Sequence, residues 1–235
     1  MRAIRRSIAG AVLFSVALAL GGCAAEQPEG GAQTAAPDNG SSSSGVEAVW
    51  LDDGRMIGVV TQGSSSCVPF AGDVTAQGQE VTVMLSDTIE GQEDRPCTAD
   101  YTARTTVVGA PDGVNPKEDV RLHVQYGDLN ASVELDGESD LTGVPGTPTE
   151  YLPSAAWVQD DTGIVLLTWG SSTCLPIVER VDETDAEVTV HFKSVDGVCT
   201  MDIVPRATMI GLAEKNDDRT LALVGGGLDA TLSVV

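Results

Sequence analysis

The sequence predicts an all-β protein made of two tandem copies of one small β-sandwich-like module, and three observations support this class. A stretch that begins at Trp50 recurs 107 residues later, at Trp157. Several short segments alternate apolar and polar side chains with a period of two, which is typical of half-buried strands. No window shows the 3.6-residue apolar stripe of a helix, and clusters of Gly, Asp and Pro interrupt the chain at short intervals.

The duplication extends over most of each copy, and its matched segments keep one order. Because the repeat is long and occurs only twice, it differs from a solenoid or a propeller. Two tandem domains and two halves of one fused fold both fit this pattern. The matched segments of the first and second copies are 50–69 with 157–176, 80–83 with 187–190, 97–100 with 199–202, and 129–132 with 228–231.

The alternating segments predict six or seven short strands per copy, as in a small sandwich. Val81, Val83 and Leu85 share one face in the first copy, as do Val188, Val190 and Phe192 in the second. The same alternation is expected to continue after the second cysteine of each copy. It would place Cys97 on one strand face with Ala99 and Tyr101, and Cys199 with Met201 and Ile203, so both cysteines are expected to point inward.

One segment of each copy, 56–60 and 164–167, is apolar on both faces. A strand that is covered on both sides is expected inside a larger assembly. Two explanations fit equally well: the copies pack against each other through these strands, or each strand is the most buried one of its own sandwich.

The first 22 residues have the three zones of a secretory signal. Arg2, Arg5 and Arg6 are followed by the apolar run 8–20, which is shorter than the roughly 20 residues that span a bilayer. The run ends in Leu20-Gly21-Gly22-Cys23, which resembles the lipobox of bacterial lipoproteins. The resemblance implies cleavage before Cys23, a lipid on that cysteine, and a cell-membrane location on the extracytoplasmic face. The alternative is an ordinary secreted protein with a chance cysteine.

Composition divides the rest of the chain. Residues 23–45 lack large apolar side chains and are expected to form a disordered tether. The predicted modules span 46–136 and 154–235, and the Gly- and Pro-rich segment 137–153 is expected to link them.

The chain beyond Cys23 is strongly acidic. All 35 acidic residues but only 10 of the 13 basic ones follow that cysteine, so this part carries a net charge of −25. Such a surface repels phosphate backbones, which argues against nucleic-acid binding. Solubility explains the acidity most simply, and attraction of basic partners is the alternative.

Each copy contributes an equivalent pair of cysteines, and in an exported chain such sets predict disulfides. Four cysteines allow three connectivities, of which Cys67–Cys97 and Cys174–Cys199 is the simplest, because a single ancestral copy would have needed its own bridge. Metal binding is the alternative, but no CxxC motif or nearby histidine supports it.

A serine-rich loop precedes the first cysteine of each pair, and Ser64, Ser65 and Ser171 are its candidate nucleophiles. Such a nucleophile needs a general base within hydrogen-bond reach. The two histidines, His123 and His191, both lie on predicted solvent faces of strands. No catalytic residue is therefore assigned, and a turn that enters the disulfide explains the loop better.

Other polar and aromatic residues recur in both copies. The pairs Asp100 with Arg104 and Asp202 with Arg206 are too far apart along a strand for direct contact, so each residue is expected to bond a neighbouring strand or turn. Trp50 and Trp157 are expected to anchor the core, whereas Trp169 has Gln62 as its counterpart and is the candidate for a contact surface. Turns are predicted at 52–54, 160–161 and 217–218, where calcium ligation is the less favoured reading.

Together these features predict a lipid-anchored envelope or cell-surface protein that acts as a non-enzymatic binding or interaction module. Its expected partners are the membrane, through Cys23, and an envelope protein or a cell-wall component. No cofactor or metal is predicted. The alternatives are a secreted hydrolase that uses the Gly-Ser-Ser loop, and a protease inhibitor that exposes a disulfide-flanked loop.

Overall fold

The computed structural model describes residues 45–88, 96–158, 163–216 and 218–235. The predicted signal peptide, Cys23, the tether up to residue 44 and the acidic pair 160–161 lie outside these residues, as does Asp217. No helix of the described part is long and apolar enough to cross a bilayer.

The described residues are nearly all β, as predicted, and each module contributes seven strands. The strands of the first module are β1 (Val46–Leu51), β2 (Met56–Gly63), β3 (Phe70–Gln77), β4 (Glu80–Ser86), β5 (Thr102–Gly109), β6 (Val120–Tyr126) and β7 (Leu129–Leu135), with a short turn η1 (Asp52–Gly54). Those of the second module are β8 (Ser154–Trp157), β9 (Gly163–Gly170), β10 (Val178–Glu183), β11 (Glu187–Phe192), β12 (Val204–Gly211), β13 (Thr220–Val224) and β14 (Ala230–Ser233).

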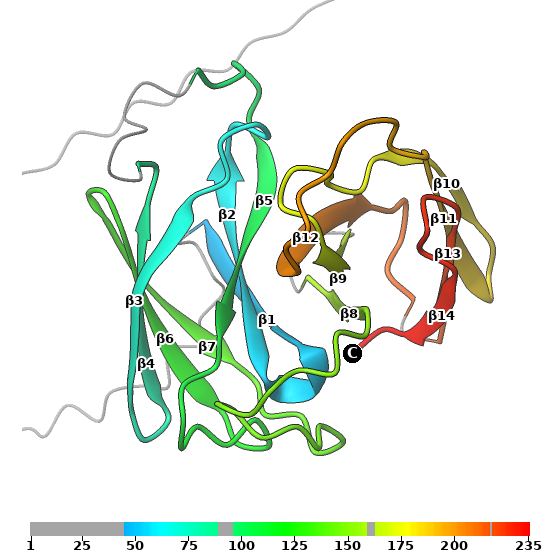
Figure 1. The fold of residues 1–235 in the computed structure, drawn as a ribbon. Coiled ribbons are helices and arrows are strands. Elements are labelled where there is room, and N and C mark those ends of the chain that lie inside the picture. Colours follow the sequence, from blue (N-terminus) through cyan, green and yellow to red (C-terminus); the bar gives the residue numbers. More distant parts are fainter. Residues whose placement is uncertain (1–44, 89–95, 159–162, 217) are drawn as a thin grey trace, which may run out of the picture. The chain divides into compact units, whose positions relative to one another are not determined.

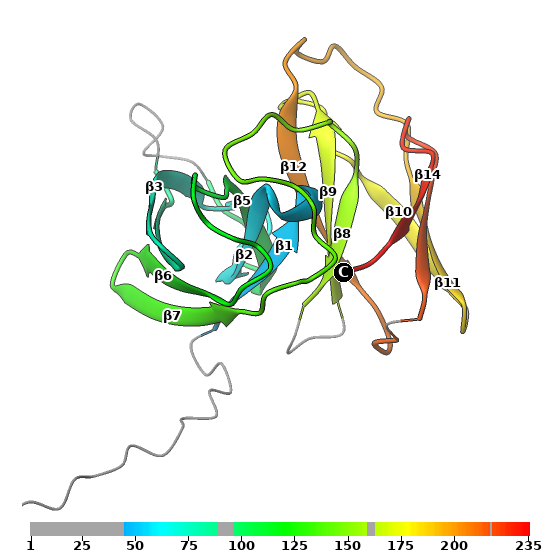
Figure 2. The ribbon, with the colours of Figure 1, turned by 90° about the horizontal axis from the view of Figure 1, so that it is seen from below.

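Each module is a sandwich of a three-stranded and a four-stranded sheet, and the two modules have the same topology. In the first module the sheets have the orders β1-β2-β5 and β3-β4-β6-β7; in the second the orders are β8-β9-β12 and β10-β11-β13-β14. The neighbours β4 and β6 are parallel, as are β11 and β13, because the intervening strand returns to the other sheet. The duplication is therefore visible in the fold (Figures 1 and 2).

The predicted alternation builds the core of each sandwich. Val81, Val83 and Leu85 of β4 are buried against Ile57 and Val59 of β2 in one apolar cluster. The second module repeats this arrangement with Val188, Val190 and Phe192 of β11. The polar partners in these strands face the outside of each sandwich, which confirms the assignment from period two.

A third apolar cluster joins the two modules. It contains Val49 and Val60 of the first module, and Val165 and Leu167 of the second, all of which are buried. The three-stranded sheets thus pack against each other through the faces that point away from their own cores. This decides between the two explanations for the doubly apolar strands: β2 and β9 are covered on both faces because the copies pack together.

The interface brings equivalent strands together, since β5 contacts β12 and β1 contacts β8. Thr105 Oγ1 lies 3.1 Å from Met209 Sδ across one contact, and Ser154 Oγ accepts a 2.8 Å hydrogen bond from the Asp52 amide across the other. Such pairing of each strand with its own counterpart is the pattern of an isologous dimer interface, here built within one chain.

The expectation of strands directly after the second cysteines is wrong. The residues between Cys97 and Tyr101 form no strand, and Cys97 and Cys199 are exposed rather than inward-pointing. Tyr101, Met201 and Ile203 are also exposed. The physical reason is that the polar side chains of this segment form hydrogen bonds with a neighbouring loop, as described below. These bonds, and not backbone pairing with another strand, set the conformation of the segment.

The segment 137–153 contains no strand, but it packs on the first module. Leu141 is buried in that module's core. The amide and hydroxyl of Thr142 donate hydrogen bonds of 2.8 and 2.7 Å to the Asp53 carboxylate, and the Gly143 amide donates to the Asp53 carbonyl. The first part of this segment is therefore held against the sandwich.

Candidate functional site

The two predicted disulfides are present, Cys67–Cys97 and Cys174–Cys199, each within its own copy. Each joins the loop that leaves the central strand of the three-stranded sheet to the segment that leads into the next strand of that sheet. The disulfides thus hold the serine-rich loops beside the segments that follow Cys97 and Cys199.

In the first module, the serine loop is tied to a threonine and an aspartate. Ser64 Oγ and Ser66 Oγ lie 2.8 and 3.1 Å from Thr98 Oγ1, which donates to the Asp100 carboxylate. The other oxygen of that carboxylate accepts a 3.2 Å hydrogen bond from the Ser65 amide. The hydroxyls of this loop are therefore occupied by one another and by the segment after the disulfide.

The second module repeats the same network. Ser171 Oγ lies 2.7 Å from Thr200 Oγ1, which donates to Asp202, and the Ser172 amide donates to Asp202 at 3.2 Å. The recurrence of Cys-Thr-x-Asp in both copies is explained by this network, because the threonine and the aspartate are the residues that hold the loop.

The electrostatics of the network make the aspartates poor bases. Hydrogen bonds from Thr98 and Ser65 lower the pKa of Asp100 to about 2, and those from Ser172 and Thr200 lower the pKa of Asp202 to about 2. A general base works best when its pKa lies near the operating pH. These carboxylates are therefore suited to holding the loop rather than to activating a serine.

The histidines are engaged elsewhere. His123 Nε2 lies 2.7 Å from a carboxylate oxygen of Glu80 on the neighbouring strand β4. His191 Nε2 lies 3.0 Å from Asp182 and 2.9 Å from Arg180, both on β10. The structure thus does not bring either ring nitrogen to a serine hydroxyl among the contacts of the described residues.

An arginine on β5 or β12 holds the other side of each loop. Arg104, which is buried, donates to the carbonyls of Ser64 and Cys67. Arg206 donates to the carbonyls of Trp169 and Cys174 at 2.8 and 2.9 Å. The expectation that the recurring aspartate and arginine bond neighbouring turns is confirmed, and in each module both bond the same serine loop.

One contact of Arg104 has no counterpart in the second copy. Its guanidinium donates a 2.7 Å hydrogen bond to the Tyr126 hydroxyl, which donates at 2.5 Å to Asp87. The position equivalent to Tyr126 is Gly225. The sequence pattern does not predict these hydrogen bonds of Tyr126, because a tyrosine at the end of an alternating strand resembles an ordinary core residue.

Both serine loops border one groove between the modules, which we call the serine-loop groove. Its volume is about 540 Å³. Its walls come from the two disulfide loops and from the facing strands β5 and β12. Its lining includes Ser65, Ser66 and Phe70 of the first module, and Ser172, Leu175 and Pro205 of the second.

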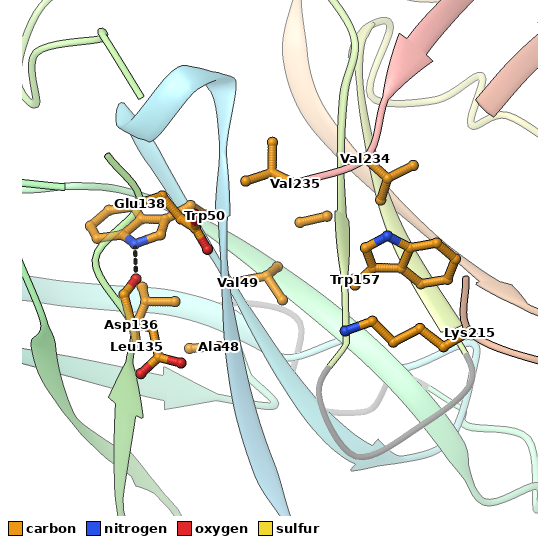
Figure 3. Close-up of a pocket in the computed structure, with 11 residues that line it drawn as sticks. Ala48, Val49, Trp50, Leu135, Asp136, Glu138, Trp157, Lys215, Val234 and Val235 are labelled. Carbon is orange, nitrogen blue, oxygen red and sulfur yellow. Dashed lines mark hydrogen bonds between the residues drawn. The ribbon is translucent and has the colours of Figure 1, made fainter. Parts of the chain in front are cut away.

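A second concavity, of about 450 Å³, lies between the modules where β1 meets β8; we call it the tryptophan cleft (Figure 3). Trp50 and Trp157 stand on opposite sides of it, with Val49 and Val235 between them. Asp136, Glu138 and Lys215 also line it, so its walls contain two acidic residues and one basic one. Both tryptophans are largely buried, as expected for core anchors.

The two tryptophans differ in their hydrogen bonds. Trp50 Nε1 donates to the Asp136 carbonyl at 2.9 Å. Trp157 Nε1 is buried without a hydrogen-bond partner among the described atoms, and the Lys215 ammonium lies 5.8 Å from the centre of the same ring. The Trp157 N–H is therefore an unsatisfied buried donor, which costs free energy.

Trp169, the candidate for a contact surface, holds the end of the inter-module segment. Its ring makes an edge-to-face contact with Tyr151 at 5.3 Å, and its Nε1 donates to the Leu152 carbonyl at 3.1 Å. Tyr151 and Leu152 are themselves exposed. Trp169 thus has an internal role, and its proposed role in contacts with a partner stays a prediction.

The acidic turn at η1 is a structural element. Burial raises the pKa of Asp52, whereas hydrogen bonds from Thr142 outweigh partial burial and lower the pKa of Asp53. Among the described residues, no group of three or more His, Cys, Asp or Glu side chains could hold a metal ion.

No family model, no curated protein and no solved structure matches this chain.

Proposed function

We propose that this chain is a non-enzymatic binding protein of the cell envelope, held by a lipid on Cys23 at the extracytoplasmic face of the membrane. The observation that carries the non-enzymatic part is the fate of the serine loops. In the first module the hydroxyls and amides of this loop bond Thr98 and Asp100, and in the second they bond Thr200 and Asp202. The carboxylate of each aspartate has a pKa of about 2. A nucleophile without a base has no means of activation.

The tryptophan cleft is the surface that we assign to binding. It is concave, and its walls combine apolar side chains with polar and charged groups that could orient a partner. The Lys215 ammonium, which lies 5.8 Å from the centre of the Trp157 ring, favours a partner that presents a hydrogen-bond acceptor beside an apolar group.

The test replaces Glu138, at the cleft, with a photo-crosslinking amino acid in the full chain, in cells. The matched probe replaces Glu134, an exposed glutamate of β7 in the first module that lies outside the cleft. A product is expected from position 138 alone. It should disappear with Lys215→Ala and persist with Lys193→Ala, because only Lys215 lines the cleft.

Two results would overturn the proposal. One is a yield of crosslinked product that is the same at positions 134 and 138, or that is unchanged by Lys215→Ala. The other is covalent labelling of Ser64, Ser65 or Ser171 by an active-site serine probe, which would favour the alternative function of a secreted hydrolase.

A further inference from the structure

The second module exposes a group of apolar side chains around its disulfide. Val198 and Met201 are fully exposed, and Leu175, Ile177 and Ile203 are about half exposed or more. We call these five residues the apolar loop patch. A soluble surface rarely exposes several large apolar side chains together unless they contact something.

One disulfide and one hydrogen bond hold the two loops of the patch together. The Cys174–Cys199 disulfide joins Leu175, next to one cysteine, to Val198, next to the other. The Lys193 amide donates a 2.9 Å hydrogen bond to the Ile177 carbonyl, which closes the two loops at their other ends. The patch is therefore one surface on two fastened loops.

Comparison of the copies shows that two side chains of the patch are particular to the second module. Both modules keep the cysteines, the threonine and the aspartate that hold the serine loop. Two of the five patch positions differ, since Val198 and Met201 replace Pro96 and Ala99 of the first copy. The other three patch residues, Leu175, Ile177 and Ile203, match the apolar Val68, Phe70 and Tyr101. The scaffold needs neither Val198 nor Met201, since these two side chains contact little of it.

The patch is also low in charge for so acidic a protein. Residues 171–177 contain no charged side chain, and residues 193–203 contain only Lys193, Asp196 and Asp202. Asp202 is bonded to the Ser172 amide and to Thr200. The loop tips themselves are thus apolar and nearly uncharged.

We propose that the apolar loop patch docks on the lipid bilayer that holds the anchor, with its side chains in the interfacial region. This rests on the proposed lipid at Cys23. Only 22 residues separate Cys23 from the start of β1, and a chain of that length spans at most about 80 Å, so a lipid on Cys23 would keep the sandwich close to the bilayer. At that distance the tether supplies a high effective concentration, so a contact too weak to bind membranes alone is populated.

The chemistry of the lipid follows from the charge. With a net charge of −25 beyond Cys23, the protein is repelled by anionic headgroups, and the patch offers little positive charge to offset this. The patch therefore fits a zwitterionic surface.

The experiment uses the lipidated full chain in zwitterionic phosphatidylcholine vesicles that contain brominated acyl chains. A fluorescent amino acid replaces Val198, and the matched probe replaces Val144, another exposed valine. Emission at position 198 is expected to shift to the blue and to be quenched by bromine, while position 144 is unaffected. Met201→Gln should reduce the quenching, whereas Met84→Gln, at an exposed methionine of β4, should not.

A probe at 198 that is unquenched, or quenched no more than one at 144, overturns the docking. So does quenching that grows when anionic phosphatidylglycerol is added. The mass of the Cys23 peptide reports lipidation separately. A chain without lipid would refute the proposed anchor, whereas a lipidated chain with an unquenched probe would refute only the docking.

Discussion

At the scale of single residues, the recurring aspartates show why a duplicated acid can be structural. Asp100 and Asp202 are solvent-exposed, yet hydrogen bonds from Thr98 and Ser65 lower the pKa of Asp100 to about 2, and those from Ser172 and Thr200 do the same for Asp202. Each carboxylate accepts from a backbone amide and from a threonine hydroxyl. These bonds favour the ionised form, so they link the loops to pH.

This linkage predicts a specific loss of stability in acid. Because the folded-state pKa lies below the ordinary value of 3.8 for an aspartate, the contribution of each aspartate is complete above about pH 4 and is lost as the pH falls towards 2. The double variant Asp100→Asn and Asp202→Asn should therefore show a shallower fall of Tm between pH 4 and pH 2. Thermal unfolding at several pH values measures this. An unchanged slope, or an equal change in the exposed-turn variant Asp128→Asn, would contradict it.

At the scale of elements, each serine loop is a structural unit held from three sides: by the disulfide, by the Thr-x-Asp segment and by an arginine on the adjacent strand. The serine-loop pattern, the cysteine pairs and the Asp/Arg recurrence were all visible in the sequence. The sequence did not show that all of them hold the same loop. The alternation after Cys97 predicted a strand, whereas side-chain hydrogen bonds set the conformation of this segment.

The arginine is expected to be the costliest of these side chains to remove. Arg104→Met keeps the apolar length but leaves the carbonyls of Ser64 and Cys67 and the Tyr126 hydroxyl without their donor. Loss of several bonds from a buried charged group should lower the free energy of unfolding by about 2–4 kcal/mol. Arg121→Met, at a half-exposed position on β6, should change it by less than about 0.5 kcal/mol. Urea unfolding compares the two variants, and equal effects would refute the role of Arg104.

At the scale of the whole molecule, the two modules share a buried interface, so they are expected to unfold together. Leu167 is fully buried in the cluster between the modules. Leu167→Ala should cost about 2–5 kcal/mol and shift a single cooperative transition. Leu175→Ala, at an exposed leucine, should have little effect. Calorimetry would contradict this if Leu167→Ala left one module's transition in place while it moved the other.

Charge and surface also act at this scale. The apolar loop patch and the tryptophan cleft are separate surfaces, one on the disulfide loops of the second module and the other where β1 meets β8. A lipid-anchored protein that uses the first surface to rest on the bilayer would leave the second free for a partner. The two experiments above test these surfaces independently.

The sequence by itself determined the all-β class, the two copies, the inward faces of strands such as β4 and β11, and the two disulfides. It could do so because side-chain alternation and matched cysteines are local or repeated signals. Only the tertiary structure decided that β2 and β9 are buried because the copies pack together, and that Asp100 and Arg104 bond the same loop. It also decided that the indole N–H of Trp50 is hydrogen-bonded, whereas that of Trp157 is not. These features depend on which distant surfaces meet, and a period in the sequence reports that a face is apolar without naming what covers it.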